Sequence, residues 1–152
     1  KIFDKCFKVI EKTGTQDQVV IKGVKRLAEV EKEFGQYLDK VHFMPIIILP
    51  NPDAKEIIDE YLASKTPPVA FEFVLEGEEV KELMSEFKNI RAAGAGIWVN
   101  SLCAHFNGGH DDEKAVLDST IYQWYIDNGI DMIQTDRPKL LLSYLRSKEV
   151  HK

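Results

Sequence analysis

Short apolar runs alternate with helical patterns along this chain, and this alternation limits its possible folds more than any other feature. The most apolar run, residues 41–49, has the pattern of a strand that is covered on both faces. Similar runs predict strands at residues 18–23, 69–75, 96–100 and 129–135. Strands that alternate with helices indicate an α/β fold with a parallel sheet and right-handed crossovers.

The segments between these runs carry apolar side chains at helical spacing. An opening helix is expected over residues 2–12, and a further helix is expected after each strand. These five helices are predicted at residues 24–38, 53–63, 78–87, 112–128 and 138–146. The chain is therefore interpreted as one helix followed by five strand–helix units.

Two architectures are compatible with five such units. An open doubly wound sheet needs no more chain than this, whereas a (β/α)₈ barrel needs about 250 residues. The 152 residues supply only five of eight barrel strands, and no glycine-rich phosphate loop follows any predicted strand. Length and composition alone therefore favour the open sheet.

Charge and cysteine content exclude several classes of protein. Lys and Arg total 20 against 25 Asp and Glu, and this net charge of -5 argues against a general nucleic-acid or membrane-surface binder. No apolar run approaches the roughly 20 residues of a membrane-spanning helix. Cys6 and Cys103 are too few for a four-cysteine zinc site but leave one disulfide open. The sequence opens at Lys1 inside a helical pattern, which suggests a fragment or a processed piece.

Two charged residues stand out at predicted strands. Phe71 and Phe73 are expected to pack against helices, so Glu72 between them would point to the opposite face, which is the interior in a barrel. A carboxylate in that position is costly unless it is paired or binds a ligand. Lys22 ends its own strand, where α/β proteins place their active sites. Either Lys22 and Glu72 neutralise each other, or at least one of them faces a ligand.

Three further residues are candidates for a site. Trp98 and Asn100 share one face of the strand at residues 96–100, either for packing and turn formation or to face a ligand. The glycine-rich loop that follows contains His110. A loop over the mouth of the sheet would leave His110 available for acid–base or metal chemistry.

Acidic residues near two predicted helices have a simpler explanation. Asp111 or Asp112 is expected to cap the helix that starts near residue 112, where a carboxylate also complements the helix dipole. Asp136 is expected to cap the last helix, whose first turn holds Pro138. These positions are therefore interpreted first as helix starts, and a place in a loop over the mouth of the sheet stays the alternative for Asp111 and Asp112.

Three segments in the C-terminal part of the chain form a recognisable set. They are Ile97-Trp98-Val99-Asn100-Ser101-Leu102, Gly108-Gly109-His110-Asp111-Asp112 and Gly129-Ile130-Asp131-Met132-Ile133-Gln134-Thr135-Asp136-Arg137-Pro138. Together they resemble the end of the glycerophosphodiester phosphodiesterase family, whose strand 7 bears Trp and Asn and whose strand 8 reads roughly G-x-D-x-I-x-T-D-x-P. Many members have Trp-Thr-Val-Asn in strand 7, where this chain is one residue shorter.

This resemblance implies the C-terminal five of eight strands of a TIM-type (β/α)₈ barrel. Residues 1–152 would then form a single partial domain that runs from helix 3 through helix 8. The implied activity is metal-dependent hydrolysis of glycerophosphodiesters to glycerol phosphate and an alcohol, a reaction of lipid metabolism.

The family's catalytic groups do not map onto this sequence. Its two histidines and its Glu/Asp/Glu ligands for Mg²⁺ or Ca²⁺ come from a His-Arg-Gly segment on strand 1, from strand 2, and from a Glu-x-Lys on strand 3. None of these motifs is present, so no catalytic or metal-ligating residue is assigned and the chain alone is expected to be inactive. The residues expected to line the substrate pocket are Lys22, Glu72, Trp98, Asn100 and His110.

Other functions and partners stay open at this stage. The alternatives are a non-catalytic α/β domain that binds a ligand or a partner, and another barrel enzyme whose last strands merely look similar. An open sheet of five strands exposes two edges, so a homo-oligomer or an associated N-terminal half is expected. The expected small-molecule partner is a glycerophosphodiester, with no nucleic acid and no transmembrane segment. Family members work on both sides of the cytoplasmic membrane, so the compartment stays open.

Overall fold

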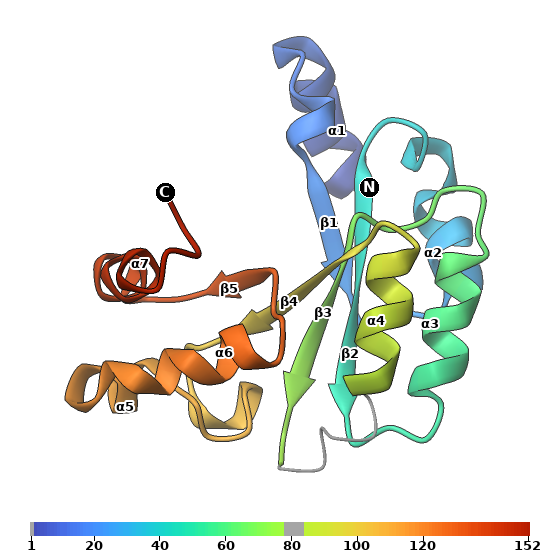
Figure 1. Cartoon of the computed structure of the whole chain (residues 1–152). Helices are drawn as coiled ribbons and strands as arrows, with labels where there is room; N and C mark the ends of the chain where they lie inside the picture. The colour runs from blue at the N-terminus through green and yellow to red at the C-terminus, as the bar shows by residue number, and fades with distance from the viewer. Residues whose placement is uncertain (1, 78–83) are drawn as a thin grey trace.

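The computed structural model describes residues 2–77 and 84–152, in which strands and helices alternate (Figure 1). The strands are β1 (Val20–Gly23), β2 (His42–Leu49), β3 (Ala70–Leu75), β4 (Gly96–Asn100) and β5 (Met132–Gln134). The α-helices are α1 (Ile2–Thr13), α2 (Leu27–Phe34), α3 (Ala54–Leu62), α4 (Met84–Ala92), α5 (Asp112–Leu117), α6 (Gln123–Asp127) and α7 (Pro138–Ser147). Short 3₁₀ turns are η1 (Gln16–Gln18), η2 (Gly35–Tyr37), η4 (Ala104–Phe106) and η5 (Ser119–Tyr122).

Within these described residues the strands form one sheet in the order β1-β2-β3-β4-β5, and each neighbouring pair is parallel. The sheet curls like half of a barrel, as the fanned strand arrows show in Figure 1. A doubly wound sheet reverses its strand order where the chain changes sides. The order here is consecutive throughout, so the prediction of parallel strand–helix units is confirmed and the open doubly wound sheet is wrong.

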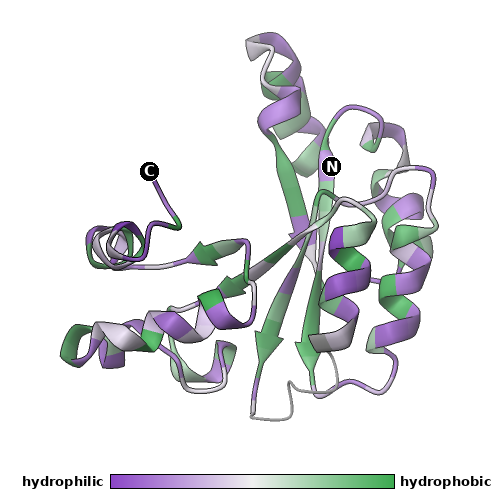
Figure 2. Ribbon diagram, viewed as in Figure 1, coloured by the Kyte–Doolittle hydropathy of each residue, from purple (hydrophilic) through white to green (hydrophobic). Residues whose placement is uncertain are grey.

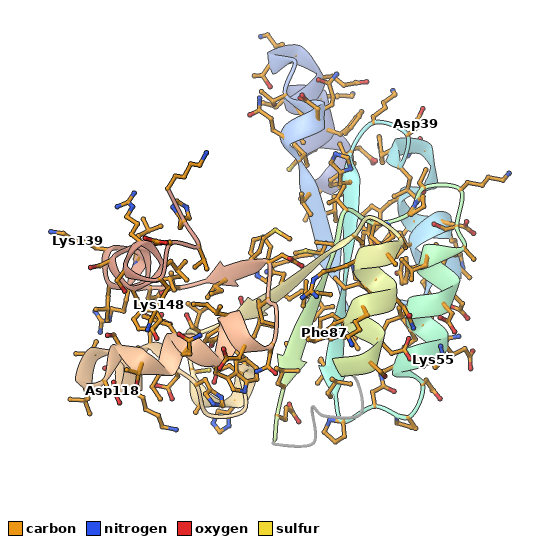
Figure 3. The ribbon with its side chains drawn as sticks, viewed as in Figure 1. Asp39, Lys55, Phe87, Asp118, Lys139 and Lys148 are labelled. Carbon is orange, nitrogen blue, oxygen red and sulfur yellow. The ribbon has the colours of Figure 1, made fainter. Side chains whose placement is uncertain are left out.

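Helices α2, α3 and α4 cover the convex face of β2 and β3 (Figure 1). Figure 2 shows these strands as largely hydrophobic, whereas the helices carry both hydrophobic and hydrophilic residues. Phe71 and Phe73 are fully buried, with ring centroids 6.3 Å from Tyr61 and 4.8 Å from Phe87, respectively. Phe87, labelled in Figure 3, extends from α4 toward the sheet. The prediction that Phe71 and Phe73 pack against helices is therefore confirmed.

The concave face carries the alternate side chains of the same strands and is less covered. Ile48 is 37 % exposed, and its partner Val74 on β3 is half-buried. All three residues of the edge strand β5 are half-buried, and β1 at the other edge alternates between exposed and half-buried residues. The tightly packed core therefore lies on one side of the sheet.

The helix predicted at residues 24–38 is shorter in the structure. It begins at Leu27, and Val24 is an exposed residue rather than a core residue. The backbone just before the helix bonds to α3 instead, because the carbonyl of Lys25 accepts a hydrogen bond from the Tyr61 hydroxyl at 2.8 Å. After Phe34 the chain continues as the 3₁₀ turn η2.

The helix predicted at residues 112–128 is three shorter pieces, α5, η5 and α6. The break lies at Asp118, whose backbone is extended and whose carboxylate accepts hydrogen bonds from the Thr120 backbone N–H and hydroxyl. Aspartate competes with the helix backbone for such bonds, and here the local turn forms in place of a continuous helix. Asp118, labelled in Figure 3, lies at the break between α5 and η5.

Two further expectations need correction at element ends. Residues 78–83 of the helix predicted at 78–87 lie outside the described residues, and α4 continues to Ala92 before Gly94 takes a positive φ of 88°. The strand predicted at 129–135 is only β5, because Gly129 and Ile130 end the preceding helix with backbone bonds to Ile126 and Tyr125.

The predicted cap of the last helix is wrong. The structure places Arg137 at the N-cap of α7 and gives Asp136 no capping hydrogen bond. The hydroxyl of Thr135 instead accepts from the Arg137 backbone N–H at 2.9 Å. Cys6 and Cys103, for which one disulfide was left open, are both free thiols.

No helix among residues 2–77 and 84–152 combines the length and the apolar character needed to span a membrane.

Candidate functional site

Four of the five predicted site residues meet on the concave face of the sheet. They are Lys22 on β1, Glu72 on β3, and Trp98 and Asn100 on β4. The parallel register places Glu72 directly beside Trp98, because these two residues are partners across β3 and β4. Lys22 pairs with Met44 on β2, so its long side chain reaches across β2 to arrive at Glu72.

Glu72 is the centre of this cluster. Its Oε2 accepts a hydrogen bond from Lys22 Nζ at 2.8 Å, and its Oε1 accepts one from Asn100 Nδ2 at 2.7 Å. The Glu72 side chain is only 4 % exposed, whereas that of Lys22 is 41 % exposed. A buried carboxylate is tolerated when a cation and further hydrogen bonds satisfy it, and both conditions hold here. The interpretation in which Lys22 and Glu72 neutralise each other is confirmed at the level of this contact.

The hydrogen bond to Glu72 leaves two N–H donors of the Lys22 ammonium for other partners. A lysine ammonium has three donors, and Glu72 takes one of them. The remaining part of the group lies at the exposed end of the pair, 5.7 Å from the centroid of the Trp98 ring. Asn100 aligns the indole by accepting from Trp98 Nε1 at 3.4 Å, a long hydrogen bond. The cluster thus presents a fixed cation beside an aromatic wall.

His110 lies in a different environment. Its Nδ1 is 3.0 Å from the carbonyl of Asn107, and its ring stacks on Trp124 with centroids 4.4 Å apart and an interplanar angle of 16°. Its own carbonyl accepts from the Tyr125 hydroxyl at 2.6 Å. The structure therefore brings His110 against α6, and its contacts are separate from those of Lys22, Glu72, Trp98 and Asn100.

Of the two alternatives for the cap of the helix that starts near residue 112, Asp111 is the cap and Asp112 has another role. Asp111 is the N-cap of α5 and accepts from the backbone N–H groups of Glu113 and Lys114. Asp112 is 2 % exposed and points inward instead. Sequence reasoning missed this role, although the signal was present: of two consecutive aspartates at a helix start, only one can be the N-cap residue.

Asp112 joins the ends of two strands. Its carboxylate accepts from Ser101 Oγ at 2.7 Å, from Tyr122 Oη at 2.9 Å, from Thr135 Oγ1 at 2.9 Å, and from the Asp136 backbone N–H at 2.8 Å. Burial, followed by the hydrogen bond to Asp112, raises the pKa of the Tyr122 phenol above its ordinary range. Because Ser101 directly follows β4 and Thr135 directly follows β5, this network fixes both strand ends beside the cluster.

The cluster offers few oxygen donors for a divalent cation. Mg²⁺ and Ca²⁺ take several oxygen ligands. In the part of the chain that the structure describes, no three His, Cys, Asp or Glu side chains converge to hold a metal ion. Glu72 is the carboxylate of the cluster, and both of its oxygens are already bonded. The cluster by itself therefore does not fit a Mg²⁺ or Ca²⁺ site.

Comparison with known proteins places the chain in a family. A search of curated proteins finds no match to this sequence. The model of the DUF4996 family, described as a domain of unknown function, matches residues 43–145. This range includes β2 from Phe43 onward, β3, β4, β5 and three of the clustered residues, and it leaves β1 with Lys22 outside. The match covers well over half of the chain, which therefore belongs to the DUF4996 family.

Proposed function

We propose that this chain is the C-terminal part of a glycerophosphodiester phosphodiesterase and that its concave face binds the substrate. The observation that carries the proposal is a cluster that reaches the carboxyl ends of two parallel strands. Lys22 is the next-to-last residue of β1 and Asn100 is the last residue of β4, and both bond to Glu72, which lies beside Trp98 in the middle of the sheet. In parallel α/β folds, ligands bind at that end of the sheet. The strand 7 and strand 8 segments that resemble the phosphodiesterase family contribute β4 and β5 of this sheet.

The proposed role of Lys22 is to hold phosphate. Its ammonium keeps one hydrogen bond to Glu72 and directs its other donors to phosphodiester oxygens. Glu72 and Asn100 restrict where the ammonium can lie, which lowers the cost of ordering it when the substrate binds. The Trp98 ring supplies a flat apolar wall for the carbon skeleton beside the phosphate.

We propose in addition that the curled sheet is five strands of an eight-stranded barrel. The consecutive parallel order and the two half-exposed edge strands, β1 and β5, support this extension. Closing such a sheet into a barrel requires further parallel strands that pair with both edges. In this proposal those strands also carry the catalytic histidines and the ligands for Mg²⁺ or Ca²⁺.

A non-catalytic ligand-binding domain is the second candidate. The observation that favours it is that Glu72, the buried acid of the cluster, already binds Lys22 and Asn100 through both oxygens. A carboxylate held in this way is suited to fixing a cation rather than to moving a proton. The same concave face would then bind a phosphorylated ligand without cleaving it.

The test is a phosphodiesterase assay on glycerophosphodiesters in the presence of Mg²⁺ or Ca²⁺. It is run on this chain and on the full polypeptide that its gene encodes. Activity in the full polypeptide alone supports the enzyme, and no activity in either supports the binding domain. Activity in residues 1–152 alone would contradict the assignment of the catalytic groups to other strands.

Single variants of the active form locate the site. Lys22→Ala is expected to lower kcat/KM about 100-fold, because a donor to a charged oxygen is lost. Trp98→Ala is expected to raise KM by up to about tenfold through lost contact area. Lys55→Ala is the matched control, since Lys55 also forms ion pairs but lies on the outer surface of α3 (Figure 3). Kinetics unchanged by Lys22→Ala would remove this cluster from the site.

A further inference from the structure

Gln134, a residue that the sequence did not single out, lies beside the cluster on the neighbouring strand. It is the last residue of β5, and Asn100 on β4 is its register partner. Neighbouring strands lie about 4.7–4.9 Å apart. Two side chains at partnered positions on one face can therefore contact the same small ligand.

The side chains of β5 show which face Gln134 occupies. Ile133 packs against the core on the convex side. Met132 lies on the other side, since a Cβ added to Gly96 would come within 2.8 Å of Met132 Cε and 3.8 Å of Ala70 Cβ. Alternation along a strand then places Gln134 on the concave face together with Met132.

The backbone of Gln134 is held firmly. Its carbonyl accepts hydrogen bonds from the Ser101 backbone N–H at 2.8 Å and from Ser101 Oγ at 3.0 Å. The next residue, Thr135, is bonded through its hydroxyl to the buried carboxylate of Asp112. A side chain that starts from such a fixed point loses less freedom on binding a ligand.

The Gln134 carboxamide itself is available. It is half-buried, and no hydrogen bond joins it to any of residues 2–77 or 84–152. The amide of its neighbour Asn100 is already committed to Glu72 and Trp98. A carboxamide both donates and accepts, and it carries no charge. It therefore suits a hydroxyl group, which also donates and accepts, while the cation of Lys22 suits the phosphate.

We propose that Gln134 hydrogen-bonds a hydroxyl group of a phosphorylated polyol whose phosphate is held by Lys22. This inference rests on the proposed substrate site and narrows its ligand class. The ligand must carry a free hydroxyl within reach of β5, so phosphates without a neighbouring hydroxyl bind less well.

The test compares two probes that differ in their hydroxyl groups. Dissociation constants for sn-glycerol 3-phosphate and for methyl phosphate are measured by NMR titration of this chain at constant ionic strength. The unmodified chain is expected to bind glycerol phosphate about three- to tenfold more tightly, the size expected for one hydrogen bond. Gln134→Leu is expected to abolish this preference while the affinity for methyl phosphate stays the same.

Two further variants separate this inference from the site on which it rests. Lys22→Gln is expected to weaken the binding of both probes by the same factor. Gln134→Ala is expected to give the same result as Gln134→Leu without introducing a bulky apolar group. If Lys22→Gln weakens binding but both Gln134 variants still bind glycerol phosphate more tightly than methyl phosphate, the site stands and only the role of Gln134 is overturned. Binding of neither probe to the unmodified chain, or binding insensitive to Lys22→Gln, would overturn the site and this inference together.

Discussion

The two faces of the sheet are built from the same strands but differ in how their side chains are used. On the convex face Phe71, Phe73, Ile97 and Val99 are all fully buried under helices. On the concave face Ile48 is exposed, and the polar residues form a connected cluster around Glu72. The convex face therefore supplies most of the buried apolar contacts of the sheet, whereas the concave face carries the partly exposed polar cluster that we propose as a binding site.

The convex face is expected to give the largest effect on stability. Phe73→Ala removes a fully buried ring that packs against Phe87, so the free energy of unfolding should fall by about 3–5 kcal/mol. Ile48→Ala on the concave face should cost only about 1 kcal/mol, because that side chain is partly in water. Urea unfolding of both variants measures the two values. Equal losses would contradict the division between the faces.

The hydrogen-bond network of Asp112 at the strand ends is expected to give the second-largest effect on stability. Asp112→Ala leaves the Tyr122 and Thr135 hydroxyls and the Asp136 backbone N–H without this acceptor, whereas Ser101 Oγ keeps the Gln134 carbonyl. Each such group costs about 1–3 kcal/mol when it stays unsatisfied, and water will satisfy some of them, so a total loss of about 3 kcal/mol is expected. Asp111→Ala, which removes the cap of α5 and a 3.9 Å ion pair with Lys114, should cost about 1 kcal/mol. Thermal and urea unfolding test this order, and a larger loss for Asp111→Ala would reverse the assignment.

The ion pair on the concave face should matter less for stability than for binding. Lys22→Met leaves the carboxylate of Glu72 buried with only Asn100 as a partner, so a loss of about 1–2 kcal/mol is expected. Replacing both charges, Lys22→Met with Glu72→Met, should return the free energy of unfolding to within about 1 kcal/mol of the unmodified chain. A double variant less stable than either single one would show that the pair mainly stabilises the fold.

The smallest effect is expected at Asp118, which belongs to neither face. Hydrogen bonds from the Thr120 hydroxyl and backbone hold the pKa of this exposed carboxyl below its ordinary value. A lowered folded-state pKa stabilises the protein above the unfolded pKa, and this contribution is lost as the pH falls through the folded pKa. The advantage of the unmodified chain over Asp118→Asn should therefore shrink below about pH 4. Urea midpoints measured across that range test the sign, and an advantage that grows in acid would contradict it.

Local patterns predicted much of the fold. The pattern Phe71-Glu72-Phe73 identified both faces of β3, because side chains alternate along any strand. The segment 112–128 was predicted as one helix because its spacing is helical on both sides of Asp118. The turn that replaces the helix there depends on two hydrogen bonds from Thr120 to the Asp118 carboxylate. The spacing of apolar residues does not reveal such bonds.

The site was predictable only in part. Lys22, Glu72 and Asn100 could be proposed because each is a polar residue inside an apolar strand or near its end, and Trp98 because it shares a face with Asn100. His110 could be proposed as well, but its position depends on the path of the loop after β4, which stacks it on Trp124. Gln134 carried no signal, since a polar residue at the end of a strand is ordinary until its register partner is known.

The sequence by itself determined the order of strands and helices, the parallel class of the sheet and the alternation of side chains, because these follow from local spacing. Only the tertiary structure decided between a consecutive, curled sheet and an open doubly wound one, and only it showed that Lys22 reaches Glu72 across β2 and that Asp112 joins two strand ends. These contacts join residues distant in the chain, and they depend on register and curvature, which no short stretch of sequence encodes.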